Sequence, residues 1–276
     1  MGILLKQELA DLEKKSRQIR ASAVEMVCNS HSAHLGSALS MVDLLTVLYF
    51  WYLKVDPKNP KDSERDRFVL SKGHGGSGLY ATLAEKGFFP KKELETYGKD
   101  GSLFAVHPSS KMVPGVEAST GSLGHGLPIG LGMALAAKLD GKPYRTVVIT
   151  SDGECDEGST WEAILAAGHW KLDNLICIVD YNKIQSFGRT EEVMDLEPFA
   201  EKFRSFNWSV CEINGHNHEE IAEALHKAPL EKGKPTAIIA HTVKGKGWSA
   251  EMENTVESHY TPPNQNDVDR LKSCLS

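Results

Sequence analysis

Two short apolar runs near the middle of the chain, separated by one helical segment, restrict its architecture. Residues 146–150 read Thr-Val-Val-Ile-Thr and residues 175–179 read Leu-Ile-Cys-Ile-Val, a pattern typical of buried strands. The segment 161–170 between them predicts a helix. A strand, a helix and a second strand in this order indicate a βαβ unit, and therefore a parallel sheet with helices on its faces.

The rest of the chain extends this pattern. Glycine and proline are frequent in residues 97–126, which predicts an irregular loop, and residues after about 261 predict a loosely held tail. No stretch resembles a linker between domains, so we expect one doubly wound α/β domain over residues 1–276. Further strands are predicted at 67–70, 210–213 and 237–240, and further helices at 4–27, 41–53, 129–139 and 218–227.

Composition narrows the class of protein. With 276 residues, 41% hydrophobic and 25% charged, the chain is typical of globular proteins, and its formal net charge of −6 disfavours binding to nucleic acid or an anionic membrane. The five scattered cysteines form no CxxC pair, which favours a reducing compartment. No signal peptide or membrane-length apolar run is evident. We therefore expect a cytoplasmic protein.

Both central strands are followed by loops rich in oxygen ligands. Asp152 follows the first strand and Asn182 the second, and one crossover separates them. Because the carboxyl ends of parallel strands meet at one edge, the two side chains are expected to lie close together. A carboxylate, an amide oxygen and a backbone carbonyl suit Mg²⁺ or Ca²⁺, and Gly153 permits close approach of a diphosphate. Alternatively, Asp152 caps the following helix and Asn182 lies in a turn.

These loops resemble the fingerprint of thiamine diphosphate enzymes, GDG followed by Asn, with SDG here at 151–153. Over nearly the whole chain the resemblance is to the transketolases. The chain departs from that family's pattern around His34 and His107, and it has His125 where many members have glutamine. The matching segments are NSHSAHLG (29–36), RFVLSKGHG (67–75), VPGVEASTGSLGHGLPIGLG (113–132), DYNKIQSFG (180–188) and HTVKGKG (241–247), followed by His259.

The resemblance implies roles for individual residues. Asp152, Asn182 and the backbone oxygen of Ile184 would hold Mg²⁺, or Ca²⁺ or Mn²⁺. Histidines that titrate near neutral pH could move protons during carbon–carbon bond chemistry, although any single histidine could instead be structural. The implied catalytic residues are His34, His74, His107 and His259. The implied contacts to thiamine diphosphate are His74, Gly121, Leu123, Asp152, Gly153, Glu154, Asn182, Ile184 and His259.

Two acidic residues nearby, Glu157 and Glu162, have two interpretations. Acidic residues are common at a helix N-terminus, where their negative charge interacts favourably with the positive end of the helix dipole. In the family, the matching acids lie at the dimer interface and link two active sites by proton exchange. The sequence favours neither interpretation.

The family's activity would be transfer of a two-carbon ketol unit from a ketose phosphate to an aldose phosphate. In transketolases, the glutamate that activates the cofactor and the arginines that bind sugar phosphates lie in a following pyrimidine domain, which these residues do not include. The resemblance therefore implies a heterotetramer with a partner chain, a C-terminal transketolase subunit that carries this domain.

Three alternatives stay open. One is a transketolase-like enzyme for a modified sugar, sulfonated or branched, or a deoxyxylulose-phosphate-type synthase. A second is a binder of thiamine diphosphate without turnover. The third, a nicotinamide-binding domain, is disfavoured, because the glycines from Gly121 to Gly126 follow no predicted strand.

Overall fold

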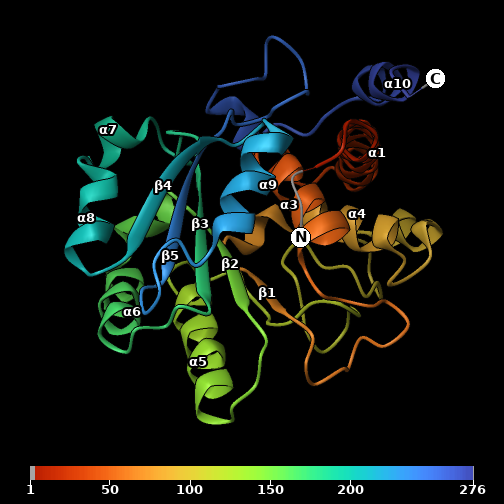
Figure 1. Ribbon diagram of the computed structural model, residues 1–276. Coiled ribbons are helices and arrows are strands. Elements are labelled where there is room, and N and C mark those ends of the chain that lie inside the picture. Colours follow the sequence, from red (N-terminus) through yellow and green to blue (C-terminus); the bar gives the residue numbers. More distant parts are fainter. Residues whose placement is uncertain (1–3, 276) are drawn as a thin grey trace.

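The computed structural model describes residues 4–275, and a five-stranded sheet forms its centre (Figure 1). All neighbouring strands are parallel, in the order β1-β2-β3-β5-β4. This arrangement confirms the predicted α/β class and the βαβ unit. The strands are β1 (Arg67–Leu70), β2 (Thr146–Ser151), β3 (Leu175–Tyr181), β4 (Ser209–Asn214) and β5 (Thr236–His241).

Helices surround the sheet (Figure 1). The α-helices are α1 (Lys6–Ser30), α2 (Leu35–Leu39), α3 (Val42–Val47), α4 (Gly76–Lys86), α5 (Gly126–Leu139), α6 (Gly158–His169), α7 (Thr190–Val193), α8 (Phe199–Ser205), α9 (His218–Lys227) and α10 (Gln265–Ser273). Shorter helical turns are η1 (Leu48–Tyr52), η2 (Gly73–Gly75), η3 (Lys91–Thr96), η4 (Gly153–Asp156) and η5 (Glu257–His259).

Alternate residues of each strand enter one of two apolar cores, because successive side chains of a strand point to opposite faces. Val147 and Ile149 of β2 belong to the core that includes α1, α3 and α4. Val148 of β2 and Val179 of β3 belong to the other, which includes α5, α6 and α8. Helices therefore cover both faces of the sheet, and its carboxyl edge is left for the loops.

The predicted loose tail is wrong. Residues 265–273 form α10, whose start is capped by Asn264 through its side-chain oxygen. Val268 and Leu271, three residues apart, are buried on one face of this helix. Lys272 pairs with Glu25 of α1 at 2.7 Å. The segment was predicted as a tail because only two of its residues are large and apolar. These two lie at helical spacing, so both are buried on the same face of α10.

The predicted helix over 41–53 is only partly correct. An α-helix covers Val42–Val47, and the chain then continues as the π-helical turn Leu48–Tyr52. The amide of Leu53 donates to the Leu48 carbonyl at 2.8 Å, a five-residue step. Because the segment is apolar on nearly every side, its hydrophobic pattern cannot reveal such a change of period.

Two further expectations concern cysteines and membranes. The five cysteines are free thiols, in agreement with the absence of a disulfide pattern. Within the described residues, no helix is both long and apolar enough to cross a bilayer.

Close contact between α6 and the end of α8 gives a test of the packing. A Cβ added to Gly168 of α6 would lie 1.8 Å from the carbonyl oxygen of Phe206. We expect Gly168→Ala to lower the free energy of unfolding by about 3 kcal/mol, because backbone must move to relieve the overlap. The matched control is Gly132→Ala in α5, where an added Cβ would have no heavy atom within 4 Å apart from its chain neighbours and the backbone of its own helix. Urea unfolding should show the control unchanged or up to about 1 kcal/mol more stable, and equal effects would contradict the packing.

Candidate cofactor site

A cavity of about 250 Å³ lies at the carboxyl edge of the sheet. It brings together segments that are far apart in the sequence. Of the site residues predicted from the sequence, all line it except Glu154. The lining residues are His34, Ser37, Lys72, His74, His107, Gly121, Leu123, Ser151, Asp152, Gly153, Asn182, Ile184, Gln185, Ser186, Lys244 and His259.

Asp152 follows β2 directly and is 1% exposed. Its carboxylate accepts the amide of Gly153 at 2.8 Å and the amide of Lys183 at 2.5 Å. Burial, and then the nearby Asp180 carboxylate, raise the pKa of Asp152 to about 6. A buried carboxylate with a raised pKa favours a nearby cation, because a cation stabilises its charged form.

The other two predicted metal ligands lie in the loop after β3. The Asn182 side-chain oxygen accepts the amide of Ile184 at 3.1 Å, which orients both residues. The Ile184 carbonyl accepts a hydrogen bond from the Lys244 ammonium at 3.0 Å. The Ile184 carbonyl oxygen therefore already faces a cation, the Lys244 ammonium. No three His, Cys, Asp or Glu side chains converge as metal ligands in the part of the chain described, so a metal here would depend on amide, carbonyl and ligand oxygens.

Gly153 permits close packing between the two loops. A Cβ at this position would lie 2.9 Å from Cγ of Gln185. The Gln185 amide donates to Asp156 at 2.8 Å, which joins the loop after β3 to the turn after β2. The loops thus form a cradle of backbone and short side chains, whose carboxylate, amide and carbonyl oxygens are of the kind that fits a divalent metal.

The four predicted histidines form one cluster, although they come from four separate segments. The ring of His34 lies 5.5 Å from His74, 6.0 Å from His107 and 4.8 Å from His259, centre to centre. His34 has a positive φ of 75°, and its amide donates to the carbonyl of His259 at 2.7 Å. Nδ1 of His34 and Nδ1 of His259 are buried without a hydrogen-bond partner within residues 4–275. One ring nitrogen of each of these two imidazoles therefore has no partner among the described residues.

Burial controls the protonation of this cluster. Burial, then the Lys244 ammonium and the neighbouring His34 imidazole, lower the pKa of His259 to about 3. Burial and then Lys72 place the pKa of His74 well below its usual range, and burial also lowers that of His34. These imidazoles are neutral near pH 7, so the expectation of titration near neutral pH is wrong for His259 and His74. A neutral imidazole still accepts a hydrogen bond at one nitrogen and donates one from the other.

Two buried lysines at the cavity were not predicted. Lys72 is 0% exposed and donates to the Ser37 carbonyl at 2.9 Å and to the Asp180 carboxylate. Asp180 also accepts hydrogen bonds from Ser40, at 2.5 Å, and Thr242. The lysine charge is therefore matched by a carboxylate, as buried charges require.

Lys244 is the second of these lysines and is 1% exposed. Within residues 4–275, its ammonium donates only to backbone carbonyls, those of Ile184 at 3.0 Å and Gln185 at 3.1 Å. Burial and the Lys72 charge lower its pKa to about 8. No carboxylate of the described residues lies within ion-pair distance of this lysine, so its ammonium adds positive charge to the cavity, which suits an anionic ligand.

Glu154 has a different position from the one implied. It is 0% exposed, and one of its oxygens accepts the Ser71 hydroxyl at 2.5 Å and the Gly124 amide at 2.8 Å. It lies behind the cavity rather than in its wall. Its contacts brace the loop that carries Gly121 and Leu123, which do line the cavity.

The loop bearing Gly121 packs closely on the turn before His74. A Cβ at Gly73 would lie 2.6 Å from the Thr120 carbonyl and 2.7 Å from the Gly121 amide. The Thr120 hydroxyl donates to the carbonyl of Leu70 at the end of β1, at 2.6 Å. Only glycine at position 73 allows this approach, which sets one wall of the cavity.

Glu157 and Glu162 are exposed, immediately before and within the first turns of α6. Neither lines the cavity. Their exposure fits both an ordinary acidic helix start and an acid at a subunit interface.

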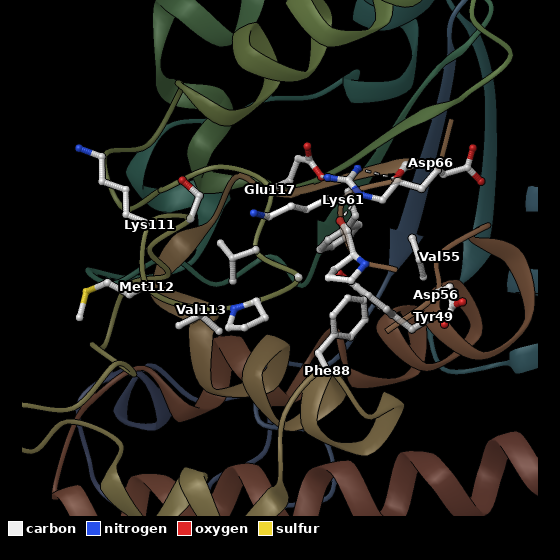
Figure 2. A pocket seen from close by; sticks show the side chains of 17 residues that line it. Tyr49, Val55, Asp56, Lys61, Asp66, Phe88, Lys111, Met112, Val113 and Glu117 are labelled. Carbon is white, nitrogen blue, oxygen red and sulfur yellow. Dashed lines mark hydrogen bonds and ion pairs between the residues drawn. The ribbon is translucent and has the colours of Figure 1, made fainter. Parts of the chain in front are cut away.

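Residues 110–117 border a second cavity, of about 370 Å³ (Figure 2). Rings of Tyr49 and Phe68 form part of its wall, and Arg65 pairs with Glu117 at 2.7 Å. None of the predicted site residues lines it. The chemistry implied by the sequence therefore belongs to the cavity at the sheet edge.

The geometry defines a class: a parallel α/β domain with a cavity at its carboxyl edge, where Asp152 and Asn182 lie next to clustered histidines. Comparison with known proteins identifies the family. Residues 12–276 match the family model described as transketolase, thiamine diphosphate binding domain. The chain belongs to this family.

Relatives of similar length carry related names. The chain is 44% identical to a protein of Phocaeicola vulgatus named as one of the subunits of apulose-4-phosphate transketolase, over 93% of this chain and 90% of the relative. It is 43% identical to a 6-deoxy-6-sulfo-D-fructose transketolase subunit of a Clostridium species, over 92% of each. Both names describe subunits of an enzyme.

Transketolases of known structure share the fold. The structure of the enzyme from Leishmania mexicana superposes with a TM-score of 0.89 at 33% identity. This match covers 96% of the present chain and 41% of that transketolase. The chain thus corresponds to less than half of that longer transketolase.

Proposed function

We propose that this chain binds thiamine diphosphate and Mg²⁺ in the sheet-edge cavity and, with a partner chain carrying the pyrimidine domain, catalyses ketol transfer. The observation that carries the proposal is the convergence of Asp152, Asn182 and the Ile184 carbonyl with four histidines in one cavity. Family membership supports the cofactor, and the donor set supports a divalent metal.

The residues divide the work. Thiamine diphosphate supplies the carbanion and the electron sink for carbon–carbon bond chemistry. Asp152, Asn182 and the Ile184 carbonyl would hold the metal, and the Lys244 ammonium would supply positive charge for the anionic cofactor. The histidine cluster would exchange the proton of a sugar hydroxyl next to the bond that breaks, with the buried neutral imidazoles as hydrogen-bond partners of the sugar.

For the substrates, we propose a ketose phosphate donor and an aldose phosphate acceptor. The relatives at 43% and 44% identity are named for a sulfonated and a branched sugar. The second candidate is therefore an enzyme that carries out the same two-carbon transfer with a modified sugar, sulfonated or branched, as donor or product.

For the assembly, we propose a heterotetramer of two copies of this chain and two partner chains. The word "subunit" in the names of the two relatives, and the 41% coverage of the longer transketolase, support a divided enzyme. The partner would supply the glutamate that activates the cofactor and the arginines that bind sugar phosphate.

The test is a transfer assay on the chain combined with its candidate partner. Xylulose 5-phosphate with ribose 5-phosphate is the first substrate pair, and apulose 4-phosphate and 6-deoxy-6-sulfo-D-fructose follow. Turnover with both chains and none with either alone is the expected result. Cofactor binding without turnover on any of these sugars would instead support a binder without catalysis.

His107 provides a prediction that separates binding from catalysis. It is exposed at the side of the histidine cluster, whereas the diphosphate cradle lies around Asp152. We expect His107→Ala to lower kcat by a factor of about 10²–10⁴ while cofactor affinity changes little, because a general acid–base group would be lost. Steady-state kinetics and a cofactor titration check this, with the exposed His226→Ala as control. Unchanged kcat would remove His107 from the catalytic set.

A further inference from the structure

A buried polar cluster lies behind the cofactor cavity, around Asp43 of α3. Asp43 is 4% exposed and accepts hydrogen bonds from Arg20 of α1, at 2.5 Å, and from Nδ1 of His216, at 2.8 Å. Nε2 of His218 lies 3.5 Å from the same carboxylate and 2.6 Å from the Ser16 hydroxyl. The cluster thus joins α1, α3 and the start of α9, and none of its members lines the cavity.

Two members of the cluster reach the segment 243–247, here called the closing segment. Nε of Arg20 donates to the carbonyl of Lys246 at 3.0 Å. Nε2 of His216 accepts the amide of Val243 at 2.8 Å. These two bonds hold the backbone on either side of Lys244, the cavity lysine that donates to backbone carbonyls.

The hydrogen-bond directions are fixed by chemistry. A ring nitrogen that accepts an N–H carries no proton, so in the neutral His216 ring the proton is on Nδ1 and is donated to Asp43. Burial alone would raise the pKa of Asp43, but the Arg20 charge and the His216 hydrogen bond lower it. The ionised carboxylate accepts from both groups at once, which holds each in the orientation that meets the closing segment.

Packing leaves the closing segment little freedom. A Cβ at Gly247 would lie 3.0 Å from Cδ of Arg20, and its φ is 82°. The amide of Gly245 donates to the carbonyl of Gly36 at 2.9 Å. With the backbone held on both sides, the Lys244 ammonium has a defined position at the carbonyls of the loop after β3.

We propose that Asp43, through Arg20 and His216, positions the closing segment and thereby places the Lys244 ammonium in the cofactor cavity. These three are positioning residues, because none of them touches the cavity. The effect on cofactor affinity rests on the proposed function, whereas the effect on the closing segment does not. Loss of one hydrogen bond to the segment should therefore alter Lys244 without dismantling the fold.

The test compares His216→Phe, which keeps a ring but removes both nitrogens, with the exposed His226→Phe of α9 as control. Asp43→Asn keeps the side-chain shape and serves as the second variant should His216→Phe fold poorly. Hydrogen exchange of amides 243–247 is measured first on the full chain without cofactor. We expect exchange there to accelerate about tenfold or more in both cluster variants, and not in the control.

Cofactor affinity supplies a second readout that a purely structural role would not produce. We expect His216→Phe alone to weaken thiamine diphosphate binding about tenfold. In a chain that already carries Lys244→Met, the same substitution should weaken binding by less than about twofold, because both changes act on the contact between Lys244 and the cofactor. Equal losses in both backgrounds, or unchanged exchange of the closing segment, would overturn the proposal. If the unaltered chain fails to bind the cofactor, the proposed function fails while the exchange experiment still decides the positioning role.

Discussion

Asp152→Asn is expected to weaken binding of thiamine diphosphate in the presence of Mg²⁺ by about 100-fold or more, because a carboxylate ligand is lost. The substitution nearly preserves the shape of a side chain that is 1% exposed. Its effect on the free energy of unfolding should be small, within about 1 kcal/mol. Two opposite effects explain this small change. Burial and the Asp180 carboxylate raise the pKa of Asp152 to about 6, so removing the buried charge is stabilising. The asparagine side chain would also lose one of the two amide hydrogen bonds that the carboxylate accepts, which is destabilising.

The control for this variant is Asp156→Asn, a matched change in the same turn. Asp156 bonds to Gln185 and does not line the cavity. Calorimetry with Mg²⁺ at saturation measures both affinities, and urea unfolding measures both stabilities. If the two variants bind thiamine diphosphate with equal affinity, Asp152 is not a metal ligand, and its side chain serves only to cap the helical turn η4.

Lys72→Met should produce the largest loss of stability, about 3–5 kcal/mol, because it leaves the Asp180 carboxylate buried without its cation. Both side chains are 0% exposed. Asp180 would keep the hydroxyls of Ser40 and Thr242 as side-chain donors. Urea denaturation of the ligand-free chain measures the effect.

The double variant Lys72→Met with Asp180→Asn separates charge burial from packing. Removing both charges should recover at least about half of the loss, since the cost of the single variant is mainly the unpaired carboxylate. A double variant less stable than Lys72→Met would contradict this account of the pair. Lys142, an exposed lysine paired with Glu64 at 3.3 Å, offers a surface comparison, with an expected loss below about 1 kcal/mol.

The sheet was predictable because its strands are short, apolar and bounded by polar loops. The predicted strand 67–70 and helix 218–227 have the observed limits, and the other predicted strands differ by one or two residues at their ends. Helix α4 gave no clear signal, since it begins Gly-Ser-Gly and glycine disfavours a helix interior. It is stabilised by burial, as its residues from Gly76 to Ala84 are all buried.

The meeting of the two loops that carry Asp152 and Asn182 was also predictable, because one βαβ crossover fixes which loops lie side by side. Asp152 and Asn182 both line the cavity, as the position of each after a strand indicated. The histidines are different: His34, His74 and His259 come from loops whose meeting no local pattern reveals. Only the resemblance to transketolases grouped them, and the structure places them together.

Lys72 and Lys244 could not be assigned from local sequence. A lysine beside glycine or serine is ordinarily solvated, and burial is rare unless it is paired. The signal lay in their neighbours, Ser-Lys-Gly-His and Val-Lys-Gly-Lys-Gly, where small residues let the backbone of other segments approach. Glu154 shows the converse, because a residue in the right loop can point away from the site.

The most direct test of the central claim is a calorimetric titration of the chain with thiamine diphosphate, with Mg²⁺ present and after its removal by chelation, alone and with the candidate partner chain. The account predicts saturable binding that requires the metal and tightens when the partner is added, because in the proposed assembly the partner would contribute the other wall of the site. Binding of equal strength without a divalent metal, or no binding under any of these conditions, would contradict it.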